Sequence, residues 1–345
     1  MTAAPGRLAL LLVAALALSD AGAGDYRASS YLFGTIAQIA VVDADAKRAQ
    51  AAVGRVFAEF DRMHRDLHAW KPGELVALNQ AIARGESRIH TTPEIAALIL
   101  QAQSLAARSG DLFNPAIGRL VGLWSFHRDK PGGPVPAAWD IAQLVVAHPC
   151  MSDVRVDGDE VTSINPSVQL DFGGYAKGYA LDRAAGLLRE EGISNALVNV
   201  GGNALALGRH GARPWRVALD TPRGSGLLAT LDLDSGEAVG TSGDYRRYYE
   251  IDGKRYSHII DPRTGYPVGG VESVTVLVPG GGGAGALSDA ASKPIFIGGK
   301  GGWREVAARM GVSRAMLVDS DGIVHITPEL RARLRFGDRV QVTVQ

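Results

Sequence analysis

Apolar residues recur along the first third of the chain at two spacings, which predict a strand and then helices. Residues 31–42 (YLFGTIAQIAVV) are apolar and β-branched, as in a single strand. Residues 47–68 place apolar side chains three and four positions apart and predict an amphipathic helix. A further helix is predicted over 93–107, with Thr91 or Thr92 as its N-cap and Gly110 at its end.

Short apolar runs joined by turns dominate the rest of the chain. A loop is predicted at 129–136 (DKPGGPVP), which could also separate two subdomains. Strands and helices follow without a regular βαβ alternation, so we expect an α+β fold, either one large domain or two subdomains in close contact. Strands are predicted within 154–164 and at 195–200, 215–219, 227–233, 238–241, 246–251, 274–278 and 315–318, and helices from the 170–179 segment to about 191 and at 303–310.

Charge and cysteine content exclude some classes of function. The chain has 36 Lys and Arg against 36 Asp and Glu, so no basic excess favours nucleic acid as a partner. Cys150 is the only cysteine and cannot form an internal disulfide. It also lies far from the N-terminus, so it cannot carry an N-terminal lipid.

The N-terminal 23 residues have the pattern of a signal peptide. Arg7 precedes an apolar run of 11 residues at 8–18, which is short for a membrane span, and Ala21-Gly22-Ala23 matches a small-x-small cleavage site. We therefore predict residues 1–23 as a signal peptide and 24–345 as an exported, periplasmic, soluble domain. The alternative is an uncleaved anchor helix, although Ser19 and Asp20 end the apolar run early.

The first chemically suggestive segment is DFGGYAKGYALD at 171–182. Glycines allow backbone to approach a ligand closely, and a helix that starts after them would present free N–H groups to an anion. Lys177 would oppose the helix dipole unless an anion lies nearby. The segment lacks the Walker A spacing, and a plain tight turn before a helix is the structural alternative.

Two more segments carry candidate chemistry. In YSHIIDPRTGYP at 256–267, His258 ends a predicted strand and lies three residues before Asp261, where it could take a proton from a hydroxyl near neutral pH. A histidine that caps the turn is the structural alternative. In the glycine run from 280 to 294, Asp289 could ligate a hard cation or cap a helix.

These segments, in this order and at these separations, resemble the FAD:protein FMN transferase (ApbE) family. The resemblance covers nearly all of the chain after residue 24 and is strongest in HIIDPRTG at 258–265. Other similar stretches are FGT at 33–35, HAWKPGELVALN at 68–79, FNPAIGRLVGLWSF at 113–126 and NALVNVGGNALALG at 195–208.

The resemblance implies an activity. Such enzymes bind FAD with Mg²⁺ at its diphosphate and move FMN onto a Thr or Ser hydroxyl of a partner protein, here an exported acceptor flavoprotein, while AMP leaves. Two other readings stay open: hydrolysis of FAD to FMN and AMP, and FAD binding without catalysis. The acceptor's identity and the oligomeric state do not follow from the sequence.

The resemblance also implies roles for individual residues. His258 would be the general base, with Asp261 as a second catalytic residue. Gly174, through its carbonyl oxygen, and Asp289 would bind the metal. Trp70 would stack on the flavin. FAD contacts are implied for Phe33, Trp70, Leu112, Phe113, Asn114, Asp171, Lys177 and Ile260.

This chain departs from the family pattern at three positions. Phe33 replaces a Met, and Asn114 replaces a common Asp. Lys293 stands where a metal-binding Thr is usual, and an ammonium has no lone pair for Mg²⁺. Either Ser292 or water replaces the Thr oxygen at a weaker metal site, or Lys293 pairs with Asp289 or the diphosphate and replaces the ion. Pro294 is also expected to interrupt a helix here.

Overall fold

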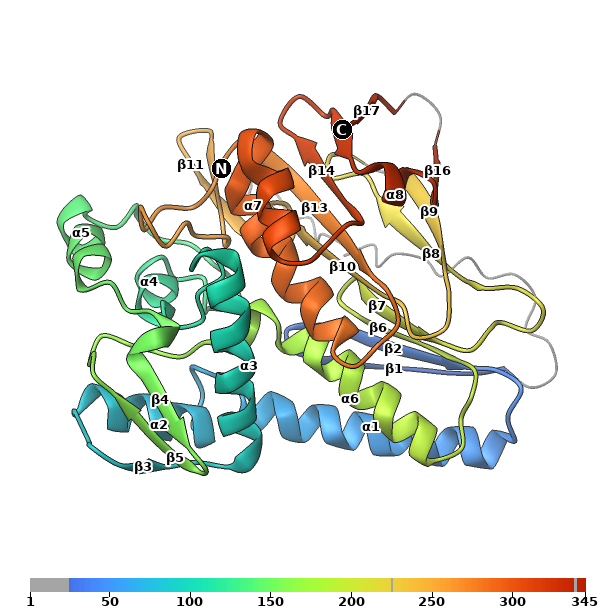
Figure 1. Ribbon diagram of the computed structural model, residues 1–345, viewed down its shortest axis with the longest axis horizontal. Coiled ribbons are helices and arrows are strands. Elements are labelled where there is room, and N and C mark those ends of the chain that lie inside the picture. The colour runs from blue at the N-terminus through green and yellow to red at the C-terminus, as the bar shows by residue number, and fades with distance from the viewer. Residues whose placement is uncertain (1–24, 225, 338–339) are drawn as a thin grey trace, which may run out of the picture.

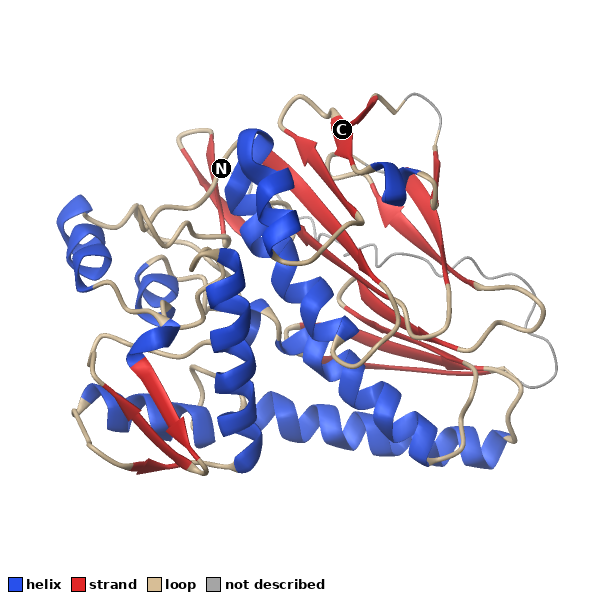
Figure 2. Cartoon of the chain, viewed as in Figure 1, coloured by secondary structure: helices blue, strands red, loops and turns tan. Residues whose placement is uncertain are grey.

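A nine-stranded sheet forms the centre of the protein, which we describe from a computed structural model covering residues 25–224, 226–337 and 340–345. Helices cover one face of this sheet, and a three-stranded sheet covers the other (Figures 1 and 2). The central order is β1-β2-β6-β7-β10-β13-β14-β15-β17. These strands are β1 (Tyr26–Leu32), β2 (Thr35–Val41), β6 (Ala196–Val200), β7 (Asn203–Leu207), β10 (Ala238–Gly243), β13 (Val271–Val278), β14 (Ala315–Asp319), β15 (Val324–Ile326) and β17 (Val342–Val344).

Eight helices lie in the described part of the chain, and the remaining strands form three small sheets. The helices are α1 (Ala46–Asp66), α2 (Glu74–Ala83), α3 (Pro93–Ser109), α4 (Gly118–Leu123), α5 (Ala138–Ala147), α6 (Ala176–Glu190), α7 (Ala284–Arg309) and α8 (Pro328–Arg331), with short 3₁₀ turns η1 (Met151–Asp153) and η2 (Phe172–Gly174). The small sheets are β16-β9-β8 (Leu334–Phe336, Leu227–Leu233, Trp215–Asp220), β3-β5-β4 (Ile89–His90, Glu160–Ser163, Val154–Asp157) and β11-β12 (Tyr248–Ile251, Lys254–Ser257).

The two faces of the central sheet bury different cores. On β2, Ile39 and Val41 face the helices α1, α6 and α7, whereas Ala40 faces the β8-β9-β16 sheet. This alternation follows from the two-residue side-chain period of a strand. The mixed arrangement and these helix layers confirm the predicted α+β fold.

Most predicted elements are confirmed, but the single strand over 31–42 is wrong. The chain folds back there as the β1–β2 hairpin, with Leu32 paired to Thr35 across a two-residue turn. Phe33 and Gly34 have φ values of 54° and 69°, as a type I′ turn requires. A Phe at a positive φ is uncommon, so the apolar sequence gave no signal for a turn at this position.

The predicted helices α1 and α3 are present, and the start and end of α3 follow the capping rules. α1 and α3 are confirmed, and the Thr92 side chain accepts a hydrogen bond from the Ile95 N–H at the start of α3. Gly110 ends α3 in the left-handed region. Helices α2, α4, α5 and α8 were not predicted. Just before Asp171, Gln169 forms an isolated parallel bridge with Ile117.

Pro294 does not interrupt the helix as expected. It lies inside α7, whose non-helical residue is Gly299 five positions later, so the helix predicted at 303–310 is the last part of α7. Helix α7 packs against β10, β13 and α6, and this burial compensates for the backbone hydrogen bond that the proline cannot make.

Helices α6 and α7 approach each other closely through two glycines. A Cβ on Gly178 would lie 2.1 Å from the carbonyl oxygen of Gly285, and one on Gly285 would lie 2.3 Å from that of Gly178. Asp182 of α6 accepts hydrogen bonds from the N–H groups of Gly285 and Ala286, each at 2.8 Å. These bonds cap α7 from its neighbour and fix the register between the two helices.

The predicted signal peptide, residues 1–23, lies outside the described residues. Within the described residues, none of the helices is long and apolar enough to cross a membrane. Residues 129–136 form the expected loop, and Cys150 is a buried free thiol.

Candidate functional site

Four elements bring the candidate residues together beside the α6–α7 contact. The N-terminal turn of α6 carries Lys177, and the second and third turns of α7 carry Asp289 and Lys293. Strand β10 packs on α7 so tightly that a Cβ on Gly240 would lie 2.5 Å from the Ser288 carbonyl oxygen. His258 directly follows β12, which ends at Ser257. Residues more than 100 positions apart in sequence therefore meet at one place.

Asp289 is the centre of this cluster and is fully enclosed. Its side chain is 1% exposed. One carboxylate oxygen accepts a hydrogen bond from the Lys293 ammonium, and the other accepts one from the Gly178 N–H at 2.9 Å. The Lys177 ammonium lies 4.0 Å from this second oxygen. Asp289 therefore supplies the anion that Lys177 needs at the start of α6, and it does not cap α7, since Asp182 does so.

The cluster carries more positive than negative charge. Burial alone would raise the pKa of Asp289, but the charges of Lys177 and Lys293 and the hydrogen bonds from Lys293 and Gly178 hold it below its usual value. Burial lowers the pKa of Lys293 to about 8 against the opposing effect of Asp289. One carboxylate thus faces two ammonium groups. The Lys177 side chain is 27% exposed, so its positive charge is accessible from solvent.

His258 lies within the field of the same lysines. Burial and, to a smaller extent, the charges of Lys177 and Lys293 together lower its pKa to about 3. The expectation that it titrates near neutral pH is therefore wrong. Its Nδ1 lies 3.0 Å from the carbonyl oxygen of Arg247. Since a carbonyl can only accept, Nδ1 carries the proton and Nε2 keeps its lone pair.

Asp261 makes a separate contact within the turn that follows. Its carboxylate accepts hydrogen bonds from the Arg263 backbone N–H and from the Arg263 guanidinium, the latter at 2.7 Å. The Gly265 N–H donates to the Asp261 carbonyl at 2.8 Å, which closes the predicted turn. Asp261 thus holds the turn, while the partner of the His258 ring is the Arg247 carbonyl.

Asp171 and Trp70 form a second group at the segment that leads into α6. The Trp70 indole N–H donates to one Asp171 oxygen at 3.1 Å, and the Gly173 N–H donates to the other at 2.8 Å. His127 stacks on Trp70 with ring centroids 4.5 Å apart. The stacking partner of Trp70 in this structure is therefore a histidine, which sequence reasoning did not single out.

The remaining predicted FAD contacts vary in burial. Phe33 is half-buried in the β1–β2 turn, edge-on to Phe60 and His64. Asn114 holds its own loop, since it donates to the Pro149 carbonyl and accepts from the Ala116 N–H. The other three are buried in hydrophobic cores: Leu112, Phe113 and Ile260.

The groups around Asp289 do not fit a divalent cation. Mg²⁺ takes oxygen ligands in near-octahedral geometry, but both Asp289 oxygens already accept hydrogen bonds. The Ser292 hydroxyl donates to the Asp289 carbonyl at 2.7 Å and pairs with Ser242 at 2.7 Å. A divalent ion about 4 Å from one ammonium would be repelled by on the order of 8 kcal/mol at a surface-like dielectric. Among the described residues, His, Cys, Asp and Glu form no group of three or more that could hold a metal.

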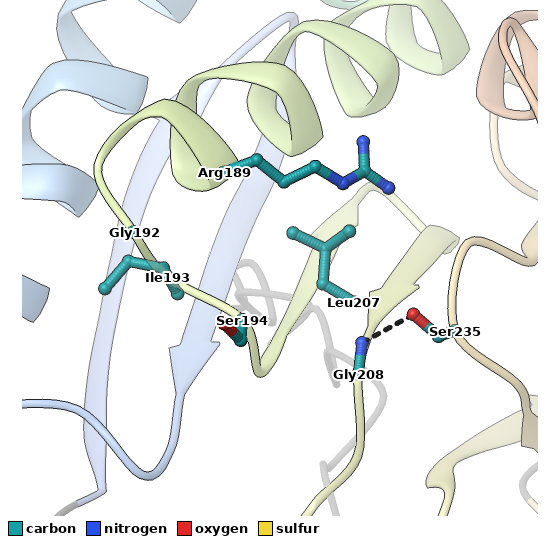
Figure 3. Close-up of a pocket in the computed structure, with 7 residues that line it drawn as sticks. All are labelled: Arg189, Gly192, Ile193, Ser194, Leu207, Gly208 and Ser235. Atoms are coloured by element: carbon teal, nitrogen blue, oxygen red, sulfur yellow. Dashed lines mark hydrogen bonds between the residues drawn. The ribbon is translucent and has the colours of Figure 1, made fainter.

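A surface pocket lies at the opposite end of α6 (Figure 3). Arg189 and Leu207 project into it, and the Gly208 N–H donates to the Ser235 hydroxyl at 2.8 Å beside it. Arg189 is 12 residues from Lys177, about 18 Å along the helix axis. The pocket is therefore distant from the start of α6. Its lining contains none of the residues predicted for the site: it is formed by Arg189, Gly192, Ile193, Ser194, Leu207, Gly208 and Ser235.

Comparison with known proteins decides the family. Residues 33–317 match the ApbE family. The chain belongs to the ApbE family. A relative from Rhodobacter capsulatus, named FAD:protein FMN transferase, is 44% identical over 328 residues, which are 94% of this chain and 61% of the relative. The chain thus spans about three fifths of that relative's length. A Klebsiella pneumoniae protein of the same name is 34% identical over 256 residues, covering 71% of this chain and 72% of the relative.

Solved ApbE structures share the fold. The ApbE protein of Thermotoga maritima superposes with a TM-score of 0.80 at 30% identity, covering 90% of this chain and 99% of the other. The apo form of the Pseudomonas stutzeri flavinyl transferase ApbE gives a TM-score of 0.77 at 27% identity, covering 92% and 98%. The α+β architecture described above is therefore the ApbE architecture.

Sequence reasoning missed several residues that shape this ApbE site. Ser242 lies on β10, and its contact with Ser292 depends on how β10 packs against α7. Arg247 acts through its carbonyl, which no side-chain pattern can reveal. Asp182 does end the first motif, and its position five residues after Lys177 signals only that it lies further along the same helix.

Proposed function

We propose that this protein is an FAD:protein FMN transferase that moves FMN from FAD to a Thr or Ser hydroxyl of a partner protein and releases AMP. The observation that carries the proposal is the neutral His258, with a free Nε2 lone pair, in the field of the two ammonium groups around Asp289. Membership of the ApbE family and the names of the relatives support it.

The reaction needs a base and positive charge, and the site offers both. The acceptor oxygen attacks the phosphorus on the flavin side of FAD, the bond from that phosphorus to the AMP phosphate breaks, and AMP leaves with the bridging oxygen. His258 Nε2 takes the hydroxyl proton, a role typically worth about 10²–10⁴ in rate. Lys177 and Lys293 stabilise the negative charge that develops on the diphosphate oxygens.

The resting state of His258 leaves its Nε2 lone pair available. With a pKa of about 3 the ring is neutral at pH 7, although in the free protein it is a weak base. When Nε2 takes that proton, the ring becomes a cation next to the diphosphate, whose negative charge offsets the repulsion from the lysines. The base is therefore strengthened when the anionic substrate is bound.

Export is part of the proposal. Residues 1–23 would be removed as a signal peptide, leaving a periplasmic, soluble domain that acts on an exported acceptor flavoprotein. N-terminal sequencing of the protein recovered from a periplasmic fraction tests this step. A mature N-terminus near Gly24 supports export, whereas an intact Met1 contradicts it.

The activity is tested with the mature protein, FAD and a purified acceptor domain. Flavin fluorescence that stays with the acceptor on a denaturing gel, together with one AMP per flavin attached, is the expected result. His258→Gln serves as the matched negative control. AMP release without labelled acceptor would indicate a hydrolase, and bound but intact FAD would indicate a binding protein; either result overturns the transferase proposal.

A further inference from the structure

The Lys293 ammonium occupies the place beside Asp289 where a metal ion bound to that carboxylate would lie. Lys293 lies four residues after Asp289 on α7, so both side chains project from the same face of the helix. The Lys293 ammonium donates to a carboxylate oxygen of Asp289 and, at 2.8 Å, to the Asp289 backbone carbonyl. It therefore uses the two Asp289 oxygens that a cation bound at this turn would take first.

The other oxygens in reach are also engaged. Ser292 is fully buried, and its hydroxyl donates to the Asp289 carbonyl while it pairs with the Ser242 hydroxyl. The second Asp289 oxygen holds the N-terminus of α6 through Gly178. A divalent ion can take its remaining oxygens from water, but to bind the Asp289 carboxylate at this turn it would have to displace the Lys293 ammonium.

We infer that Lys293 replaces the divalent cation in this protein, so that the FAD diphosphate binds to Lys177 and Lys293 without a metal. A Lys ammonium is a compact charge with three donor hydrogens. Two of its donors are used by Asp289, and the third is left for a phosphate oxygen. Lys177 lies on the other side of the same carboxylate and is more exposed, so it provides the second contact.

This inference rests on the proposed function only for the identity of the ligand. Exclusion of a metal from Asp289 is a property of the free protein and is measurable without FAD. Binding of Mn²⁺, a paramagnetic substitute for Mg²⁺, is therefore followed by electron paramagnetic resonance in the native mature protein and in Lys293→Thr. We expect no specific binding to the native protein and binding to the variant, whose hydroxyl adds an oxygen ligand and removes the competing charge.

Affinity for FAD is then measured by calorimetry in EDTA and in Mg²⁺. The native protein should bind FAD equally under both conditions. Lys293→Thr should bind about 10- to 100-fold more weakly in EDTA, as expected for the loss of a charged hydrogen bond, and should recover in Mg²⁺. Lys293→Met is the matched control, because it lacks both the charge and the oxygen; its weak binding should not recover in Mg²⁺.

The outcomes distinguish failure of the metal replacement from failure of the proposed function. Mn²⁺ bound to the native protein, or FAD affinity of the native protein that depends on Mg²⁺, overturns the replacement of the metal while the transferase proposal stands. No binding of FAD in either condition overturns the proposed function and the diphosphate contact together. Recovery of Lys293→Met in Mg²⁺ also counts against the inference, because the metal would then bind without the oxygen at position 293.

Discussion

Gly178→Ala tests whether close contact between α6 and α7 builds the site. The added Cβ would lie 2.1 Å from the Gly285 carbonyl oxygen and 2.7 Å from the Asp289 Cβ, compared with about 3.5 Å for ordinary contact. The helices must therefore separate by roughly 1 Å. Such overpacking costs about 1–3 kcal/mol of stability. The same shift stretches the 2.9 Å bond from Gly178 to Asp289, and misplacement by 1 Å can lower a rate by about 10²-fold.

Gly186→Ala provides the matched control in the same helix. A Cβ at Gly186 would have no atom within 4 Å, so the substitution should stabilise α6 by about 0.5–1 kcal/mol through helix propensity alone. Denaturant unfolding measures both free energies, and the gel assay for flavin transfer measures activity. Equal effects of the two substitutions on stability, or full activity of Gly178→Ala, would refute the argument that the glycine contact positions Asp289.

Three further predictions concern single side chains. His258→Gln should lower flavin transfer about 10²–10⁴-fold with FAD affinity retained; unchanged transfer would exclude it as the base. Because the folded protein lowers the pKa of His258 to about 3, the native protein should lose stability as pH falls below about 6.5, the usual histidine pKa, and His258→Gln should lose less in the same denaturation series. Asp182→Ala should destabilise by about 1–3 kcal/mol, since two N–H groups at the start of α7 lose their acceptor; a change within error in denaturant unfolding would count against the cap.

Local sequence patterns predicted the elements that are determined by interactions between residues close in sequence. The apolar periodicity of α1 and the Thr92 cap of α3 depend on residues within a few positions, and both were found as expected. The turn at Phe33 was hidden because an aromatic residue occupies a position that usually favours Gly or Asn. The continuation of α7 through Pro294 depends on packing against β10 and α6, which overrides the local preference of proline.

In the candidate site, too, the sequence indicated individual residues, whereas their contacts depend on tertiary packing. Spacing along the chain identified Lys177, His258 and Asp289 as residues of interest, and the alternative in which Lys293 pairs with Asp289 is found in the structure. The anion beside Lys177 is Asp289 itself, more than 100 residues later, and only the α6–α7 contact reveals it. The low pKa of His258 likewise arises from burial and from lysines on two other elements, so the isolated motif suggested a normal value.

Calorimetric titration of FAD into the mature, metal-free protein and into Lys177→Met tests the central claim most directly. If ammonium groups around a buried carboxylate hold the diphosphate, the native protein binds FAD, and the variant binds it about 10- to 100-fold more weakly. FMN, which lacks the second phosphate, should bind more weakly than FAD. Equal affinity of the native protein and Lys177→Met for FAD, or no binding by the native protein, would contradict the account.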